Sequence, residues 1–172
     1  MLYELKDWLG FERLPKKGRY LRYYLAGFAD GEASFSVSIK KHPQMKFGWV
    51  IDPVFQVYQH KKNLAILELF RRVLNCGYIK PKSPKSNVWV YIVSQRKALA
   101  EKVIPFFKKH KLLTQKWNDF CLFEQIIKKM QNREHTTKEG FVEIITLACK
   151  MNELGKQRKY QLHQILEEVR NK

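Results

Sequence analysis

The stretch LAGFADGEA, Leu25–Ala33, decides the fold, because a helical pattern gives way within it to two-residue alternation. Gly27 and Gly31 are four residues apart and would share one face of a helix. Small residues spaced in this way let two helix backbones approach closely. Glu32 would lie in the last turn, where the helix dipole disfavours a carboxylate. An acid placed against that field is better explained if a cation lies beside it.

Composition bounds the function of the chain. With 172 residues and 45% apolar residues, it is long and apolar enough for one domain with a substantial core. Lys and Arg number 33 against 16 Asp and Glu, for a net charge of +17. Such a charge indicates a polyanionic partner, most often nucleic acid. Without a long apolar run or a signal-peptide pattern, we expect no membrane partner and a cytoplasmic or organellar-matrix protein that is not secreted. The three cysteines suggest neither a disulfide framework nor a zinc site.

Hydrophobic periodicity predicts an α+β fold. A helix over 19–30 leads into a strand over 33–41, in which Phe35, Val37 and Ile39 alternate with polar residues. A second strand over 50–60 alternates similarly, and Asn63 is a plausible N-cap for a helix that ends at Gly77. The remaining predicted elements are a hairpin with strands over 78–80 and 88–94 and helices over 98–107, 114–130, 138–154 and 156–169.

The two predicted hairpins would form a four-stranded antiparallel sheet with one apolar face and one polar, basic face. The polar face carries side chains that can hydrogen-bond to base edges, with Gln suited to adenine and Lys to guanine. A two-stranded ribbon is also narrow enough to enter a major groove. The residues expected to contact DNA are Ser34, Ser36, Ser38, Lys40, His42, Asp52, Gln56, Tyr58, His60, Lys80, Lys82, Lys85, Asn87, Trp89 and Tyr91.

The nonapeptide resembles the signature of the LAGLIDADG homing endonucleases. Leu25, Ala26, Gly27, Asp30 and Gly31 match common choices of that motif, and Glu32 stands where the family keeps a metal-binding acid. Ala33 departs from the usual final Gly. The resemblance covers 19–130 and implies an αββαββα core. It leaves 1–18 as an N-terminal extension and 131–172 as helices packed on the same domain.

The resemblance also implies a set of catalytic residues. Glu32, helped by the Gly31 carbonyl, would bind a divalent cation, for which Mg²⁺ is well suited. Structural support is the favoured role of Asp30. Gln59, which ends the string FQVYQ, would order water around the scissile phosphate, although a strand-end amide remains an open reading. Lys116 is the first choice for a lysine that polarises this water network, and Lys111 is the second.

A single copy of the motif implies a homodimer, because one chain supplies one carboxylate and cutting both DNA strands needs two. The implied activity is a site-specific double-strand break in a long, partly palindromic DNA target, made by an intron-encoded enzyme without a small-molecule cofactor. The expected dimer interface consists of Leu25, Ala26, Gly27, Asp30 and Gly31.

Two other functions remain open. A splicing maturase or regulator of the same fold would bind nucleic acid without cutting it, although the retained acid at Glu32 argues against this. A basic structural or ribosome-associated protein would account for the charge but not for the motif. Neither the target sequence nor a coexisting maturase activity follows from the residues.

Overall fold

Four strands form an antiparallel sheet in the order β1-β2-β4-β3. The structure is a computed structural model that describes residues 18–151 and 160–170. The main elements are α2 (Gly18–Glu32), β1 (Ala33–Lys41), β2 (Trp49–His60), α3 (Leu64–Leu74), β3 (Tyr78–Pro81), β4 (Val88–Val93), α4 (Arg96–Ala98), α5 (Ile104–Lys109), α6 (Lys116–Gln131), α7 (Lys138–Lys150) and α8 (Leu162–Arg170). The predicted α+β fold is confirmed.

The junction between α2 and β1 has no linker, since α2 ends at Glu32 and β1 begins at Ala33. The expected alternation of β1 is confirmed, because Phe35 and Val37 are buried while the three serines that alternate with them are partly exposed. β1 pairs with β2 from Ala33 opposite Val57 to Lys41 opposite Trp49. The motif thus places the last turn of α2 next to the end of the β1–β2 ribbon at which β1 begins.

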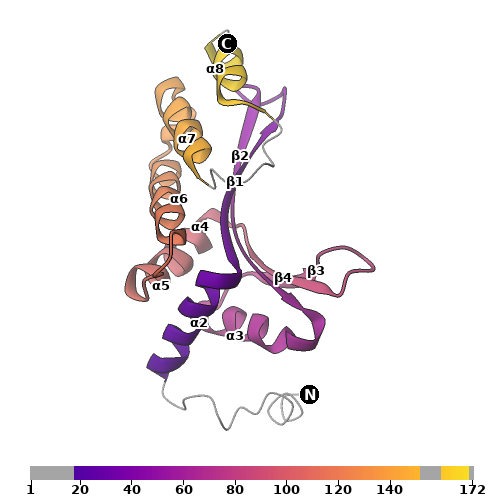
Figure 1. Ribbon diagram of the computed structural model, residues 1–172. Coiled ribbons are helices and arrows are strands. Elements are labelled where there is room, and N and C mark those ends of the chain that lie inside the picture. Colours follow the sequence, from indigo (N-terminus) through magenta and orange to yellow (C-terminus); the bar gives the residue numbers. More distant parts are fainter. Residues whose placement is uncertain (1–17, 152–159, 171–172) are drawn as a thin grey trace.

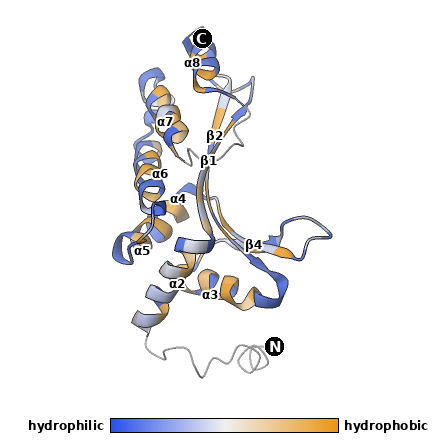
Figure 2. Ribbon diagram, viewed as in Figure 1, coloured by the Kyte–Doolittle hydropathy of each residue, from blue (hydrophilic) through white to orange (hydrophobic). Residues whose placement is uncertain are grey.

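The apolar face of the sheet is covered by helices. Phe35 lies at its centre, with ring centroids 5.0 to 5.4 Å from those of Phe55, Phe107, Phe120 and Phe123. Figure 1 shows α5, α6 and α7 as a column along one side of the ribbon, with α3 beneath its lower part. Figure 2 shows that the β3–β4 loop is hydrophilic. The opposite face of the sheet carries no helix among the described residues.

Three details of the helices differ from the prediction. The helix expected over 98–107 is divided into α4, a π-helical turn over Leu99–Val103, and α5. Pro105 lies in the first turn of α5 and has no N–H, so the α-helical hydrogen-bond pattern cannot run through it. Asn63 makes no side-chain cap bond, and α3 ends at Leu74 instead of reaching Gly77, with Asn75 after it in the left-handed region at a φ of 51°.

The C-terminal helices pack on the core. α7 contacts α6 and β1, and α8 contacts α7. The helices expected over 138–154 and 156–169 correspond to α7 and α8, but 152–159 lies outside the described residues. The same holds for 1–17, which makes up nearly all of the expected N-terminal extension.

Candidate functional site

The end of α2 presents two oxygen-bearing groups to open space. Glu32 is exposed, and within the described residues its carboxylate makes no hydrogen bond or ion pair. A Cβ added to Gly31 would meet nothing within 4 Å. The last carbonyls of a helix have no partner inside the helix, so the Gly31 carbonyl is available beside this carboxylate. A carboxylate and a carbonyl are the ligand types that Mg²⁺ prefers.

Asp30, two residues earlier, is fully engaged within the chain. Its Oδ2 accepts a hydrogen bond from the Leu113 N–H at 2.7 Å, and the Thr114 N–H lies 3.1 Å from the same atom. Its Oδ1 accepts from the Thr114 hydroxyl at 2.5 Å. This carboxylate therefore fixes the loop before α6 against the end of α2, which agrees with the structural role favoured for it.

Lys116 reaches the same end of α2. Its Nζ donates to the Ala29 carbonyl at 3.0 Å. Burial lowers the pKa of Lys116 below its ordinary value, while the carboxylates of Asp30, Glu32 and Asp119 act in the opposite direction. The structure thus brings the ammonium group of Lys116 into the electric field of the Glu32 carboxylate.

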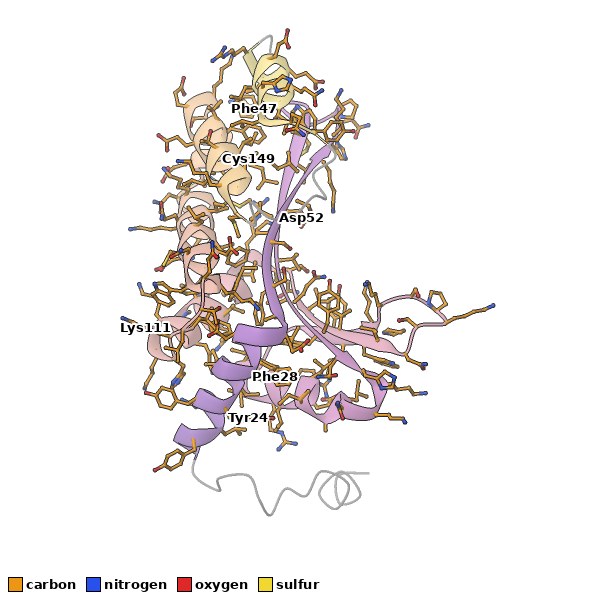
Figure 3. All side chains as sticks on the ribbon, viewed as in Figure 1. Tyr24, Phe28, Phe47, Asp52, Lys111 and Cys149 are labelled. Atoms are coloured by element: carbon orange, nitrogen blue, oxygen red, sulfur yellow. The ribbon has the colours of Figure 1, made fainter. Side chains whose placement is uncertain are left out.

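Lys111, the second choice, points elsewhere. Its Nζ lies 5.6 Å from the centre of the Trp117 ring and makes a cation–π contact there. Figure 3 shows Lys111 on the outer side of the helical column. The geometry therefore favours Lys116 over Lys111.

Gln59 lies two residues beyond Val57, the last residue of β2 that pairs with β1. It shares the side of the strand on which Val57 is buried, because alternate residues of a strand face the same way. Its Oε1 accepts a hydrogen bond from the His60 N–H at 2.7 Å. Gln59 is therefore at the end of the ribbon nearest to α2, with its amide nitrogen available to a ligand.

The open face of the ribbon carries most of the residues expected there. Lys40 Nζ and Asp52 Oδ2 form an ion pair at 2.7 Å. The Tyr58 hydroxyl donates to Gln56 Oε1 at 2.9 Å. Partly exposed on this face are Ser34, Ser36, Ser38, Asp52, Gln56 and Tyr58, while Lys40 and His60 are exposed.

The second hairpin extends this face. Lys80 and Tyr78 are exposed, and their strand partners, Val90 and Ile92, lie on the side of β4 that continues the open face. Tyr78 was missed by sequence reasoning. The predicted residues Lys82, Lys85 and Asn87 are exposed in the loop between β3 and β4, and His42 is exposed in the β1–β2 loop.

The structure contradicts one of the expected DNA contacts and places another on the opposite side of the sheet. Tyr91 is 0% exposed, and its ring packs against Phe55 and Phe70 in the core. Trp89 lies on the same side of β4 and packs partly buried against that core. The sequence Val88–Val93 is apolar on both sides of the strand, so alternation could not show which side faces the helices.

The expected interface on α2 also needs correction. Leu25 and Ala26 are 0% and 3% exposed within the chain itself, so their side chains cannot contact a partner. Gly27 and Gly31 have open space where a Cβ would lie. Tyr20 and Tyr24, 59% and 47% exposed, continue this face of α2 toward its start. The stripe of Tyr20, Tyr24, Gly27 and Gly31 is called the α2 stripe below.

Two kinds of feature are absent from residues 18–151 and 160–170. No three or more His, Cys, Asp or Glu side chains cluster as a self-contained metal site there. No helix in that part of the chain is long and apolar enough to cross a membrane.

Solved structures resemble the whole arrangement. The archaeal intron-encoded homing endonuclease I-Vdi141I, solved in complex with DNA, is 31% identical with a TM-score of 0.83, covering 90% of this chain and 98% of that one. The homing endonuclease I-TnaI is 33% identical with a TM-score of 0.77, covering 86% and 97%.

Sequence relatives differ in how much of their length is matched. A probable intron-encoded endonuclease of Neurospora crassa is 37% identical over 130 residues, 75% of this chain and 28% of that protein. The DNA endonuclease I-CeuI of Chlamydomonas moewusii is 35% identical over 70% of this chain and 57% of its own length. The chain thus spans little more than a quarter of the first protein and over half of the second.

A third relative is matched nearly end to end. The homing endonuclease I-ApeII of Aeropyrum pernix is 30% identical over 85% of this chain and 88% of its own length. Residues 25–127, more than half of the chain, match the family described as LAGLIDADG endonuclease. The chain belongs to the LAGLIDADG endonuclease family.

Proposed function

We propose that the protein is a site-specific, Mg²⁺-dependent DNA endonuclease that acts as a homodimer and cuts both strands of a long, partly palindromic target. The observation that carries this proposal is the pair formed by Glu32 and Lys116 at the end of α2. An exposed carboxylate that makes no hydrogen bond or ion pair with the described residues lies beside a partly buried ammonium group held on the Ala29 carbonyl.

The end of α2 has the donor set for a divalent cation. The Glu32 carboxylate and the Gly31 carbonyl would hold Mg²⁺, which takes few protein ligands and keeps several waters. When bound, the ion lowers the pKa of a water and neutralises charge on a phosphate. Lys116 provides a fixed positive charge next to this site, and Gln59 provides an amide donor at the adjacent end of β2.

The open face of the sheet is the surface for DNA. It combines hydrogen-bonding side chains such as Gln56 and Lys80 with a chain charge of +17, which favours phosphate contacts. The DNA complex of I-Vdi141I, a structure of the same fold, supports this assignment. The intron-encoded relatives support an intron-encoded origin and an organellar or cytoplasmic location.

Two protomers would meet along the α2 stripe. Gly27 and Gly31 permit close approach of the helices, and Tyr20 and Tyr24 add apolar area with polar tips. A two-fold axis there places one Glu32 on each side of the dimer centre. Each protomer then serves one DNA strand.

The test is Glu32→Gln, which keeps the size of the side chain and removes its charge. We expect cleavage of a DNA target in Mg²⁺ to be lost, while sequence-specific binding persists because the sheet face is unchanged. Glu139→Gln, an exposed acid on α7, is the matched control and should cut normally. Full cutting by Glu32→Gln contradicts the assignment. A wild-type protein that binds DNA but never cuts it supports the maturase or regulator instead.

A further inference from the structure

The outer half of the β1–β2 ribbon extends beyond the part of the sheet that includes β3 and β4. β4 pairs with β2 between Phe55 and His60, so from Val54 back to Trp49 β1 is the only strand partner of β2 within the described part of the chain. This outer ribbon runs from Ser36 opposite Val54 to Lys41 opposite Trp49. It is about 20 Å long at roughly 3.4 Å per residue. An isolated two-stranded ribbon is only marginally stable in water, so it needs support from elsewhere.

Aromatic contacts with the C-terminal segment supply this support. Phe47, in the loop at the end of the ribbon, packs on Phe141 of α7 with centroids 4.8 Å apart. Trp49 meets Tyr160 edge to face at 4.9 Å. Figure 1 shows α8 at the free end of the ribbon, and Figure 3 places Phe47 beside α7 and α8. The apolar side of the outer ribbon is therefore covered by residues far away in the sequence.

Polar contacts tie the same segments together. Lys41 Nζ forms an ion pair with Glu168 Oε1 of α8 at 2.6 Å. Lys46 Nζ donates to the Thr136 carbonyl at 2.8 Å, just before α7. α8 is held in turn by Ile165 and Val169, which are 1% and 0% exposed. We call α7, Tyr160 and α8 the brace.

The other side of the outer ribbon carries no helix or strand among residues 18–151 and 160–170. Lys40 and His42 are exposed there or at its end, and Met45 at the loop tip is 47% exposed. Of the basic residues of this region, Lys41 contacts Glu168 of the brace, and Lys46 contacts the Thr136 carbonyl just before α7. One side of the outer ribbon thus packs on the C-terminal helices, and the other side can contact a ligand.

We propose that the brace holds the outer ribbon in its reading position and thereby determines base preference at the outer positions of the DNA target. This inference rests on the proposed function. A ribbon about 20 Å long spans about six base pairs at roughly 3.4 Å each. Sequence discrimination requires side chains held at fixed positions on base edges, which a fraying ribbon cannot provide. Tyr160, Glu168 and Val169 are then positioning residues, although they lie beyond the family match at 25–127.

Two variants of full-length protein weaken the brace to different extents. Tyr160→Ala with Glu168→Gln removes the ring contact and the ion pair, and Val169→Asp places a charge at a buried position to undock α8. Glu124→Gln is the matched control, because it removes an ion pair with Lys108 between α5 and α6 on the same helical column, outside the brace. All three leave the end of α2 unchanged.

The first measurement is amide hydrogen exchange of residues 40–50 in the free protein. We expect exchange to be about tenfold faster in both brace variants and unchanged in β4 and in the control. Unchanged exchange at residues 40–50 in Val169→Asp overturns the brace. Because this measurement needs no DNA, it remains valid whether or not the proposed function holds.

The second measurement uses the duplex that the wild-type protein selects from a randomised DNA library, together with every single-base variant of that duplex. In both brace variants, the preference for the selected base over the other bases should fall about fivefold or more at the outer positions. At the central positions this preference should not change. An equal loss at all positions, or none at any, overturns the reading role. If the wild-type protein selects no duplex, the proposed function fails, and the reading role fails with it.

Discussion

The Asp30 carboxylate and the Thr114 hydroxyl, 84 residues apart in the chain, are joined by a 2.5 Å hydrogen bond. The Thr114 Oγ1 also accepts from the Lys116 N–H at 3.3 Å, at the start of α6. Asp30 therefore links the helix that ends at Glu32 to the helix that begins at Lys116. The two groups of the candidate active site hold their relative position through this contact.

Thr114→Val should separate the positioning role from the fold. It keeps the shape of the side chain and removes the hydroxyl, so the free energy of unfolding should fall by only about 1 kcal/mol. Cleavage should fall more, by roughly 10- to 100-fold, because small displacements of a reacting group are costly. Thr114→Ser restores the hydroxyl and should restore cleavage under single-turnover conditions. If Thr114→Ser is as slow as Thr114→Val, the hydroxyl does not position Lys116.

Lys116→Met should abolish the contribution of the ammonium group, with a loss of cleavage of about 100-fold or more. Lys111→Met, which removes a charge of the same type from the Trp117 ring, should cut at nearly the wild-type rate. The opposite ranking would make Lys111 the functional lysine. Single-turnover cleavage of one duplex by both variants decides between them.

The substitution Lys116→Met should also change how stability depends on pH. Burial lowers the pKa of Lys116, so between that lowered value and the ordinary 10.5 the unfolded chain binds a proton that the folded chain has released. In this window, stability rises with pH. Denaturant unfolding at increasing pH should therefore show wild-type protein gaining stability relative to Lys116→Met. A constant difference across this range would contradict the lowered pKa.

The strands predicted most readily from the sequence were those in which polar and apolar residues alternate clearly. β1 alternates serine with large apolar residues, so both its ends and its faces were predicted correctly. β4 has apolar residues on both sides, and the faces assigned to Trp89 and Tyr91 were wrong. In the second half of α2, small and apolar residues occur on several sides of the helix. Only the packing shows that the side with Leu25 and Ala26 is the buried one.

In the candidate site, too, the residue in a local motif could be predicted and the residues placed by long-range contacts could not. Glu32 could be identified because it belongs to a local motif. Lys116 could not be separated from Lys111 by sequence alone, because the path of the loop between them depends on its hydrogen bonds to Asp30. The support of the outer ribbon by Tyr160 and α8 is likewise a long-range contact without a local signal.

Tyr91→Phe tests the corrected face of β4. The Tyr91 hydroxyl donates to the Cys76 carbonyl at 2.8 Å, and burial raises the pKa of this phenol far above its usual range. Removing the hydroxyl leaves a carbonyl without this donor, which should lower the free energy of unfolding by about 1–3 kcal/mol. Base preference should not change. Tyr78→Phe, on the exposed β3 strand, should leave stability unaltered; a shift of base preference in Tyr91→Phe would return Tyr91 to the DNA surface.

Gly27→Leu tests the dimer without disturbing the protomer. A Cβ at Gly27 meets nothing within 4 Å, and leucine is the better helix former by roughly 0.5–1 kcal/mol, so the protomer should fold at least as stably as wild type. In a dimer joined along the α2 stripe, the added side chain would separate the two helices and cost several kcal/mol of association free energy. Sedimentation should show monomers, and double-strand cutting should be lost although Glu32 is intact. Gln125→Leu on the exposed face of α6 is the control and should remain dimeric. A Gly27→Leu protein that sediments as a dimer and cuts both strands would place the interface elsewhere than on α2.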